Sequence, residues 1–509
     1  MLKDIVSLCK RRGFIFQSNE IYGGQRGCYD YGPLGLELKK NIQNSWWKDT
    51  VKRRHLNSKV YGIETSLLNE GSVFKASGHL KLFFDTVSRC VLSDCSFRID
   101  KVGPLDIRNG EILINASSPE ELESYRAAIK KLCVDLLVSE QNSGLLLQVD
   151  DLVGNELSLK RQDGSSFTIP YYGFGSPCNS PFISTPKRAN LMFRTFKGAV
   201  DPLSMNEDQI EKDSLFLRPE TTQGIMTNFM NVVNAENIAD FPFGIAQIGK
   251  SFRNELQSEQ FIFRTLEFEQ MELEFFVKPE NGKIAMEYWR ERRMKWWNGL
   301  LNTKDNVRER EHEDKELAHY ADQCFDLEYK FPWGFSEVEG IANRSDFDLK
   351  CHSRESGQEL TLKNQIEYPT CIESSTGVNR AMLAILFDAL VMPHEDAKKR
   401  KYLKLHPSLA PVKLAVLPVI DLPHLKQKAQ GIYDAIMEIT DWNWNVDLSM
   451  ENSIGKRYMK NDEIGTPFCI TIDEKTCLDD SVTIRFRDDC RQERVSIQEV
   501  IDIVRNAIK

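Results

Sequence analysis

The sequence predicts an α+β protein, and three features carry that prediction. Apolar and polar residues alternate over 243–252 and again over 261–276, which is the period-two pattern of β-strands. Residues 381–390 instead form an apolar helix. From Pro407 the pattern changes again, because 412–420 read as a buried strand. We expect helix, strand, helix and strand to follow it, so the chain should end in a separate α/β domain.

Breaks in this pattern divide the chain into four segments, at 1–84, 85–188, 189–405 and 406–509. The first begins the core with amphipathic helices at Leu2–Phe16 and Leu34–Thr50. The second reads as an insertion with short strands, a charged helix Pro119–Glu140 and a Gly-, Pro- and Ser-rich loop Tyr172–Pro186. The third resumes the core around a helical stretch at about 284–323. The fourth is the α/β tail domain.

Composition points to a multidomain enzyme in a reducing compartment. The chain has 509 residues, a net charge of -9 and twelve cysteines without framework spacing. We find no apolar run long enough to span a membrane and no leader pattern before the first helix, so we expect a cytoplasmic protein. The acidic charge argues against indiscriminate nucleic-acid binding, although local patches decide contact. Candidate basic patches are Lys39, Lys40, Lys48, Lys52, Arg53 and Arg54, and Arg485, Arg487, Arg491 and Arg494.

Three arginines stand in signatures that suggest a nucleotide site. Arg253 lies in Phe252–Glu255, Arg264 follows Phe263, and Arg380 begins the helix after Gly377. A guanidinium keeps its charge at any working pH, and its planar fork matches phosphate oxygens. A hairpin could present Arg253 and Arg264 from adjacent strands to one ligand. The alternative for the hairpin alone is a surface ribbon with ordinary ion pairs.

A competing motif lies in the first strand. Gly244–Ser251 fits the P-loop pattern G-x-x-x-x-G-K-[ST]. A P-loop needs a flexible turn and a helix that opens after the lysine. Here two isoleucines alternate within the motif and Phe252 continues a strand pattern, so we interpret the match as accidental.

A series of sequence blocks resembles one known family. In these blocks the chain is similar to the class II aminoacyl-tRNA synthetases, and within them to the homodimeric glycyl-tRNA synthetases. The resemblance covers nearly the whole chain. The blocks are Tyr29–Gly35, Ala76–His79, Asn190–Phe193, Leu217–Gly224, Ala246–Lys250, Phe268–Glu272, Glu316–Tyr320, Glu337–Arg344, Asp346–Leu349 and Leu409–Pro411.

The resemblance implies an antiparallel sheet flanked by helices, followed by an α/β anticodon-binding domain. It implies a ligase that activates glycine with ATP and Mg²⁺ and transfers it to tRNA(Gly). It also implies a homodimer, for which Trp46 and Trp47 are interface candidates, with plain core packing as their alternative. The other function left open is a synthetase-like accessory protein without catalysis. Such chains normally lose the phosphate arginines, whereas Arg253, Arg264 and Arg380 are all present.

The resemblance also assigns roles in the nucleotide site. Arg253 would hold the α-phosphate, and Arg380 the γ-phosphate and one side of adenine, opposite Phe268. Arg264 would hold the bent triphosphate, Glu255 would accept the adenine amino group, and Glu337 would ligate Mg²⁺. Arg253, Arg380 and Glu337 are the predicted catalytic residues. The full predicted ATP set is Arg253, Asn254, Glu255, Phe263, Arg264, Thr265, Leu266, Glu267, Phe268, Glu337, Val338, Gly377, Val378, Asn379 and Arg380.

Glycine must be selected by its ammonium and by exclusion of larger side chains, because it has no side chain of its own. Carboxylates do both. By resemblance the predicted glycine set is Arg98, Glu220, Phe268, Glu269, Gln270, Met271, Glu272, Glu373, Ser374, Ser375, Thr376 and Gly377. The alternatives are a helix N-terminal charge for Glu220 and a strand-face salt bridge for Glu272.

The chain departs from the family pattern at several positions. Leu266 replaces a usual arginine, Ser374 a usual proline, and Asn379 a usual aspartate. These changes spare the phosphate arginines, so we expect activity. Many relatives carry paired C-x-x-C motifs in the insertion, whereas Cys90, Cys95 and Cys178 of this chain do not have that spacing, and we predict no zinc.

Overall fold

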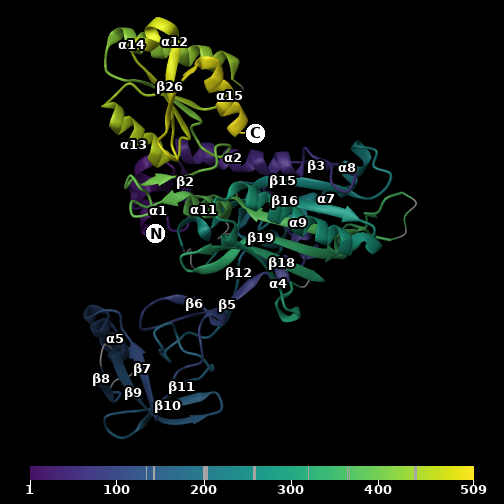
Figure 1. Cartoon of the computed structure of the whole chain (residues 1–509). Coiled ribbons are helices and arrows are strands. Elements are labelled where there is room, and N and C mark those ends of the chain that lie inside the picture. The colour runs from purple at the N-terminus through teal and green to yellow at the C-terminus, as the bar shows by residue number, and fades with distance from the viewer. Residues whose placement is uncertain are drawn as a thin grey trace. The chain divides into compact units, whose positions relative to one another are not determined.

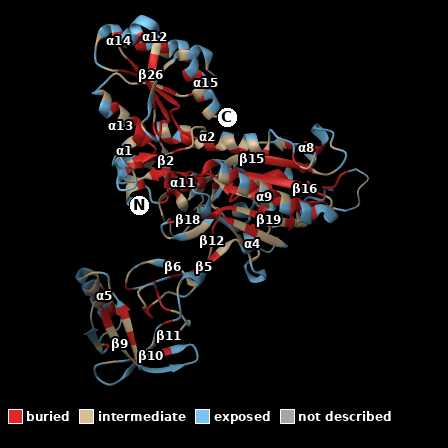
Figure 2. Ribbon diagram, viewed as in Figure 1, coloured by how far each residue is buried: buried red, intermediate tan, exposed pale blue. Residues whose placement is uncertain are grey.

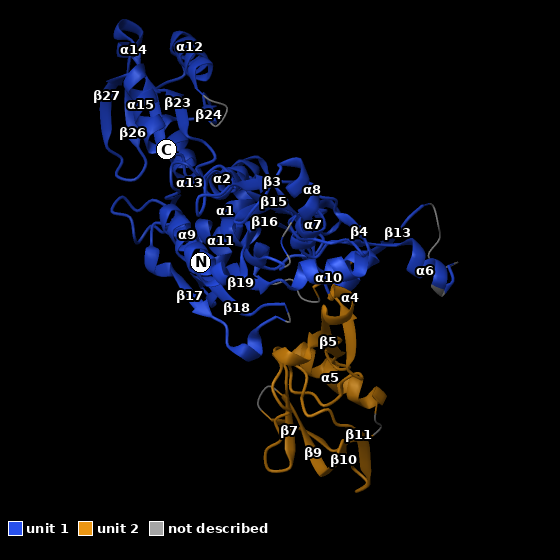
Figure 3. Ribbon diagram, turned by 90° about the vertical axis from the view of Figure 1, so that its right-hand side faces the viewer, with its two compact units in different colours: residues 1–77, 194–253, 258–509 blue, residues 78–193, 254–257 orange. Residues whose placement is uncertain are grey.

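The structure is a computed structural model that describes residues 1–132, 135–141, 144–198, 205–255, 260–318, 320–363, 365, 367–440 and 444–508. Its contacts divide the chain into two compact units (Figure 3). The first unit comprises Met1–Ser77, Arg194–Arg253 and Ser258–Lys509, and the second comprises Gly78–Phe193 and Asn254–Gln257. The predicted insertion at 85–188 falls within the second unit. The four-segment division itself stays a prediction.

A seven-stranded sheet forms the centre of the first unit (Figure 1). Neighbouring strands are antiparallel except for the last pair, which is parallel. The predicted antiparallel sheet is therefore confirmed. In spatial order its strands are β17 (Val307–Glu311), β18 (Gln323–Phe331), β19 (Gly334–Ser345), β20 (Thr370–Gly377), β16 (Glu267–Val277), β15 (Phe243–Phe252) and β3 (Val60–Gly62).

The two faces of this sheet differ because side chains alternate along each strand. On β16, Met271 and Leu273 enter the main hydrophobic core, whereas Glu272 and Glu274 carry carboxylates to the other side. All four are buried, and most of β16 is red in Figure 2. We call the side that holds Glu272 and Glu274 the polar face, and the opposite side the apolar face.

Three helices pack on the apolar face: α2 (Pro33–Thr50), α9 (Gly282–Leu300) and α11 (Val378–Ala389). The predicted helix at 34–50 is thereby confirmed. Trp46 of α2 is fully buried in this core. A side chain buried within one chain cannot anchor a second chain, so core packing explains Trp46. Trp47 is partly exposed and lies against Gly62, where an added Cβ would approach its ring to 2.3 Å.

Short helices cover one end of the polar face. They are α7 (Thr222–Thr227), α8 (Phe229–Ala235) and α10 (Phe347–Ser356). Ile225 and Phe229 pack there against Phe276 of β16 and Leu349 of α10 in a second hydrophobic cluster. This cover keeps water away from the carboxylates of β16.

The structure confirms the predicted hairpin, in which β15 and β16 pair antiparallel, but its second strand begins later than predicted. β15 runs unbroken through Gly244–Ser251, so that segment is a strand and the P-loop interpretation is wrong. The chain does not resume as a strand at Phe261. Gln260 and Phe261 have φ of 57° and 61°, a left-handed backbone that cannot continue a strand, and Phe261–Phe263 form a short 3-10 helix. Residues 256–259 of the loop lie outside the described residues.

Gly249, inside the P-loop pattern, lies against a buried arginine that leaves little room for a side chain. An added Cβ would lie 2.3 Å from Nη2 of buried Arg218, which donates hydrogen bonds to Lys250 O and to Thr65. We therefore expect Gly249→Ala to lower the free energy of unfolding by about 1–3 kcal/mol, measured by urea denaturation. Gly299→Ala in α9 is the control, because no atom lies within 4 Å of its added Cβ. Equal stability of Gly249→Ala and the wild type would contradict this packing role.

Three predicted helices are shorter in the structure. The first helix, α1 (Leu2–Arg12), stops at Gly13, whose φ is 76°, and β1 (Ile15–Gln17) follows. α9 stops at Leu300, so the rest of the predicted stretch 284–323 includes edge strand β17 rather than helix. In β17 basic and acidic residues follow one another from Arg308 to Glu311. Hydrophobic periodicity does not distinguish such a charged segment from a helix. The charged helix α5 (Pro119–Leu132) ends before β8 (Val138–Gln141).

The second unit has its own hydrophobic core, centred on Ile112, Ile114, Leu145 and Leu147. The predicted loop at 172–186 contains no helix and no strand of the named elements. The Sγ atoms of Cys90 and Cys178 are 3.8 Å apart. In the described part of the chain no three-ligand cluster joins these to Cys95, and the absence of zinc stays a prediction.

The strands of this unit form a five-stranded and a three-stranded sheet. The first contains β11 (Ser166–Pro170), β10 (Glu156–Lys160), β9 (Gly144–Val153), β7 (Glu111–Asn115) and β8. The second contains β12 (Lys187–Asn190), β5 (Phe84–Arg89) and β6 (Ser96–Arg98). Its helices are α4 (His79–Leu82), α5 and the 3-10 helix Ile99–Lys101.

The tail is a five-stranded mixed sheet with helices, as predicted. Its strands are β24 (Val446–Leu448), β23 (Leu414–Pro418), β25 (Phe468–Ile472), β26 (Ser481–Phe486) and β27 (Gln492–Ser496). Its helices are α12 (Pro423–Ile439), α13 (Ile454–Ile464), α14 (Glu474–Asp479) and α15 (Ile497–Ala507). The last described element is therefore helix α15, whereas we expected a final strand.

The predicted basic stretch of the tail is not an exposed patch. Arg485 and Arg487 are buried, and Arg485 donates two hydrogen bonds to Asp462, at 2.8 and 2.9 Å. Both arginines hold the domain together instead of facing a partner. Arg491 and Arg494 also have acidic partners, in Glu493 and in Asp473 and Asp479.

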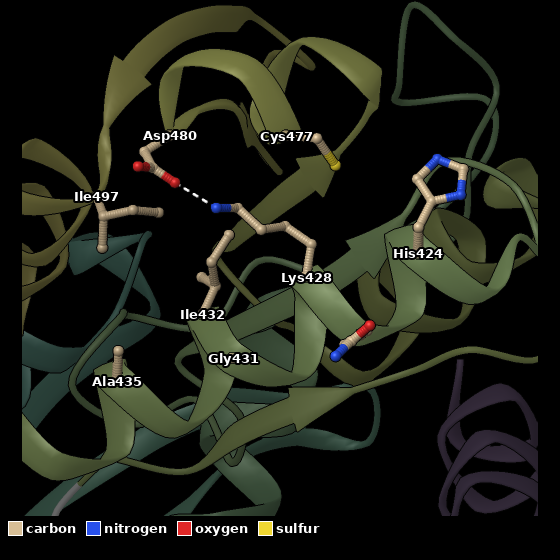
Figure 4. A pocket seen from close by; sticks show the side chains of 9 residues that line it. His424, Lys428, Gly431, Ile432, Ala435, Cys477, Asp480 and Ile497 are labelled. Atoms are coloured by element: carbon tan, nitrogen blue, oxygen red, sulfur yellow. Dashed lines mark hydrogen bonds and ion pairs between the residues drawn. The ribbon is translucent and has the colours of Figure 1, made fainter.

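A cavity of about 550 Å³ lies between α12, α14 and the start of α15 (Figure 4). Lys428 lines it and is paired with Asp480 across the opening. His424, at one end, contacts Glu474 at 2.9 Å. These acidic partners leave the cavity with little positive charge to attract an anion.

The remaining elements are short and connect these parts. They are β2 (Tyr29–Tyr31), β4 (Leu68–Glu70), α3 (Gly71–Ala76), β13 (Arg194–Phe196), α6 (Glu207–Asp213), β14 (Ser214–Leu217), β21 (Leu390–Val391), β22 (Tyr402–Leu403), and the 3-10 helices Glu20–Tyr22, Pro279–Asn281, Lys304–Asn306 and Asp314–Glu316. Among the described residues, every helix is too short or too polar to cross a lipid bilayer.

Candidate active site

The polar face brings the three predicted catalytic residues together. Arg380 lies in the first turn of α11, and its Nη1 is 3.0 Å from Glu337 Oε2 of β19. The Arg380 guanidinium holds the pKa of Glu337 below its ordinary value, and the charge of Arg253 adds to the effect. Glu337 is therefore an ionised carboxylate within the field of two guanidinium groups.

Aromatic rings orient both arginines. The guanidinium carbon of Arg380 lies 4.6 Å from the ring centroid of Phe263, and its Nε donates to Phe263 O at 3.3 Å. Arg253 directly follows β15. It lies 5.5 Å from the centroid of Phe268, and its Nε donates to Pro219 O at 3.1 Å. Cation–π contact of this kind fixes a long side chain without neutralising its charge.

The loop between β15 and β16 is held by backbone contacts. Arg253 N donates to Leu266 O at 2.9 Å, and Thr265 Oγ1 donates to Glu267 O at 2.8 Å. Arg264 is partly buried directly after the 3-10 helix, not on a strand as expected. The exposed pair Lys250–Glu267 joins the adjacent strand ends.

Several predicted site residues lie elsewhere. Glu269 faces α2 from the apolar side, where it accepts hydrogen bonds from Lys39 at 2.8 Å and Gln43 at 2.6 Å. Because neighbours on a strand point in opposite directions, Glu269 and Glu272 cannot share one pocket. We therefore withdraw Glu269 from the predicted glycine contacts. Lys39, taken for part of a basic patch, is neutralised in the same contact.

The side chains of four further predicted residues also point into the apolar side of the sheet. Met271, Val338 and Val378 belong to the hydrophobic core, and Ser374 Oγ donates to Glu339 Oε1 at 2.7 Å. Thr376 has the same parity as Ser374 on β20. Asn379 is buried and accepts a hydrogen bond from Glu269 N at 3.2 Å. These residues support the site from behind, and their side chains do not enter it.

Three predicted residues belong to the second unit. Arg98 pairs there with Asp85 at 3.1 Å and Asp100 at 2.8 Å. Asn254 and Glu255 are in the same unit. Their predicted roles beside Arg253 stay predictions.

A cluster of buried carboxylates surrounds Arg344 on the polar face. Arg344 Nη1 donates to Glu373 Oε2 at 2.6 Å, and its Nε donates to Asp348 Oδ2 at 2.8 Å. Glu220 Oε1 lies 3.8 Å from Arg344 Nη2, and Glu272 accepts a hydrogen bond from Thr221. We use the name acidic pocket for Glu220, Glu272, Glu274, Glu373 and Asp348 with Arg344.

The acidic pocket has more carboxylates than cations, and the pKa values reflect this. Burial and the charge of Glu220 raise the pKa of Glu272. Burial raises the pKa of Glu373 to about 7 against the opposing charge of Arg344. Burial works to lower the pKa of Arg344, but Asp348 and Glu373 raise it well above its ordinary range. A second cation placed here would relieve this repulsion.

Uncharged polar side chains on the same face form hydrogen bonds around the acidic pocket. Gln270 accepts a hydrogen bond from Ser251 at 2.6 Å and donates to Ser375 Oγ at 3.3 Å. Gln223 donates to Glu220 at 2.9 Å and to Asp348 at 3.1 Å. Gly377 ends β20 three residues before Arg380 of α11, so Glu373 of the acidic pocket and Arg380 of the arginine site are joined by one strand end.

Sequence reasoning missed three members of the pocket: Glu274, Arg344 and Asp348. Glu274 has the parity of Glu272 on the same strand, and this signal was available. Arg344 has the parity of Gly340 and Ala342 on β19, whose partners on β20 are Ser375 and Glu373 of the polar face. Its ion pairs with Asp348 and Glu373 become visible only in the folded structure.

Comparison with known proteins agrees with this geometry. The family model described as tRNA synthetase class II core domain (G, H, P, S and T) matches residues 204–388. A second model, described as anticodon binding domain, matches residues 413–507. A glycine–tRNA ligase of Alkaliphilus oremlandii is 39% identical, over 100% of this chain and 98% of the relative. This chain belongs to the glycine–tRNA ligase family. A glycine–tRNA ligase of Streptomyces coelicolor is also 39% identical, over 97% of this chain and 96% of its own length.

Solved structures support the fold of this family member. The prolyl-tRNA synthetase of Giardia lamblia, in complex with prolyl-adenylate, matches with a TM-score of 0.60 at 13% identity. The match covers 98% of this chain and 74% of that chain. The α+β fold with a class II core and an anticodon-binding domain is therefore confirmed. Arg253, Arg380, Glu337 and the acidic pocket all lie within residues 204–388.

Proposed function

We propose that this chain is an ATP-dependent glycine–tRNA ligase, which forms glycyl-adenylate and transfers glycine to the 3′ end of tRNA(Gly). The chain belongs to this family, and one observation of its structure supports the proposal most directly. An acidic pocket and two guanidinium groups lie on the same face of one sheet, so a zwitterion and a triphosphate can meet there.

In the first step the glycine carboxylate would attack the α-phosphorus of ATP, and pyrophosphate would leave. Negative charge builds on the phosphoryl oxygens, so fixed cations stabilise the transition state. Arg253 and Arg380 supply such charge. No general base is needed, because the carboxylate is already a nucleophile, and positioning contributes much of the rate.

Glu337 suits the predicted role of Mg²⁺ ligand. Its carboxylate is ionised beside Arg380 and is 48% exposed, so it offers a hard oxygen donor to solvent. Mg²⁺ bound there would neutralise phosphate charge during the transfer. Glu337 itself holds Arg380 in place at 3.0 Å.

The acidic pocket would select glycine. Its surplus carboxylates attract the ammonium group, and buried Glu272 and Glu373 occupy the volume that a larger side chain would need. Excluding an added methyl group by contact with buried atoms is worth about 1–3 kcal/mol in such a site. The proposed partners are therefore glycine, ATP and tRNA(Gly), with the tail contacting the anticodon.

We also propose, from the resemblance to the homodimeric synthetases, that two copies associate in the cytoplasm. Sedimentation of the purified chain would test the stoichiometry. A monomer across the working concentration range would contradict it.

ATP–pyrophosphate exchange tests the activity. We expect exchange with glycine and at least about tenfold less with alanine or serine at equal concentration. Exchange independent of any amino acid, or none at all with an intact fold, would reject the ligase. The second outcome would favour a non-catalytic accessory protein.

Glycine affinity should depend on pH through Glu373. Its raised pKa of about 7 leaves it partly protonated at neutral pH, and it must ionise to receive an ammonium group. We expect the KM for glycine to fall as pH rises from 6 to 8, by about tenfold per linked proton at most. In Glu373→Gln this dependence should flatten while the KM for ATP stays unchanged. A dependence that survives in Glu373→Gln would contradict the assignment.

A further inference from the structure

Three possible metal ligands lie close together beside β17, the edge strand of the central sheet. His312 directly follows β17, and its backbone N donates to Cys324 O at 3.0 Å. Cys324 and Asp326 are two residues apart on β18 and so point to the same side. One ligand atom from each of the three lies within 4.8 Å of the others, and His312 Nε2 is 2.8 Å from Asp326 Oδ2.

The neighbouring strand leaves room above these donors. On β19 the partners of Cys324 and Asp326 are Ala342 and Gly340, the two smallest residue types. A Cβ added to Gly340 would have Asp326 Oδ1 at 3.9 Å and Glu337 Oε1 at 4.0 Å as its nearest neighbours. The space beside Gly340 is therefore bordered by carboxylate oxygens.

We propose that His312, Cys324 and Asp326 bind one divalent transition-metal ion of the zinc type. Thiolate, imidazole and carboxylate are the three donor classes that zinc takes in proteins, whereas Mg²⁺ and Ca²⁺ prefer oxygen alone. Three protein donors leave a fourth position open. On binding, the Cys324 thiol releases its proton to solvent, and the His312–Asp326 hydrogen bond gives way to two bonds to the ion.

This site is connected to the arginine site through Glu337. Glu337 Oε2 contacts Arg380 at 3.0 Å, while Oε1 borders the space beside Gly340. Glu337 is not one of the three donors that lie within 4.8 Å of one another, but it borders the space beside them while it contacts Arg380. The proposal does not depend on the ligase activity, because the ion would bind without ATP, glycine or tRNA.

Cobalt titration of the metal-free full-length protein tests the proposal. Co²⁺ replaces zinc in such sites, and a cysteine thiolate bound to it gives a charge-transfer absorption band. The parent protein is Cys90→Ser, because Cys90 and Cys178 Sγ atoms lie only 3.8 Å apart and can bind cobalt themselves. We expect one equivalent of Co²⁺, a thiolate band, and displacement of both by Zn²⁺.

In that parent, Cys324→Ser should abolish the band and weaken Co²⁺ binding at least about tenfold. Asp326→Asn should weaken binding but keep the band. Cys351→Ser is the matched control, since Cys351 is a partly exposed thiol of α10 outside the cluster, and it should change neither quantity. A band that persists in Cys324→Ser, or that never forms in the parent, would overturn the proposal. Circular dichroism confirms that each variant is folded.

Discussion

Arg380→Ala is expected to reduce glycine-dependent ATP–pyrophosphate exchange by about 10³-fold or more. Removing one preoriented donor from a charged transition state costs about 10²–10³ in rate, and removing a phosphate arginine costs about 10³–10⁵. Arg380 also contacts Glu337, so the substitution removes the cation and leaves the proposed Mg²⁺ ligand without its partner. Arg380→Lys keeps the charge but loses the planar fork, so its exchange activity should lie between that of the wild type and that of Arg380→Ala.

Loss of fold should not explain this result. Arg380 and Glu337 are 24% and 48% exposed, and such pairs contribute at most about 1 kcal/mol to stability. Arg505→Ala is the control, because Arg505 is an exposed arginine of α15 that pairs with Asp502 in the same helix. Exchange in Arg380→Ala within tenfold of that control would refute the proposed nucleotide site.

Arg344→Leu is expected to lower the free energy of unfolding by about 3–5 kcal/mol. Removing one partner from a buried ion pair leaves uncompensated charge in a low-dielectric interior. Arg344 is the cation of the acidic pocket and contacts Asp348, Glu373 and Glu220. Urea denaturation, or the midpoint of thermal unfolding where unfolding is irreversible, measures the loss.

The same substitution on the outside of α10 provides the comparison. Arg354 is exposed, and Arg354→Leu should change stability by no more than about 0.5 kcal/mol. The loss in Arg344→Leu should shrink at low pH, where Glu373 is protonated. If Arg344→Leu were as stable as Arg354→Leu at pH 8, the acidic pocket would not be held by this cation.

Sequence reasoning found the alternating strands, the helix with Arg380 and the tail domain, because each has a local pattern. It assigned Glu269 and Glu272 together since both lie in one family block, although strand parity sends them to opposite faces. It also extended a strand to Phe261, because hydrophobic periodicity does not reveal the left-handed backbone at Gln260 and Phe261. Arg344 meets Glu373 of β20, and His312 depends on the pairing of β17 with β18, and neither contact is a local property.

The two faces of β20 separate the demands placed on its residues. Glu373 and Ser375 lie on the polar face, where the ligand is proposed to bind. Ile372 and Ser374 pack on the apolar face. A substitution of Ser375 would therefore alter the ligand side of β20 without opening the packed interior behind it, whereas Glu373 also serves the fold through its ion pair with Arg344.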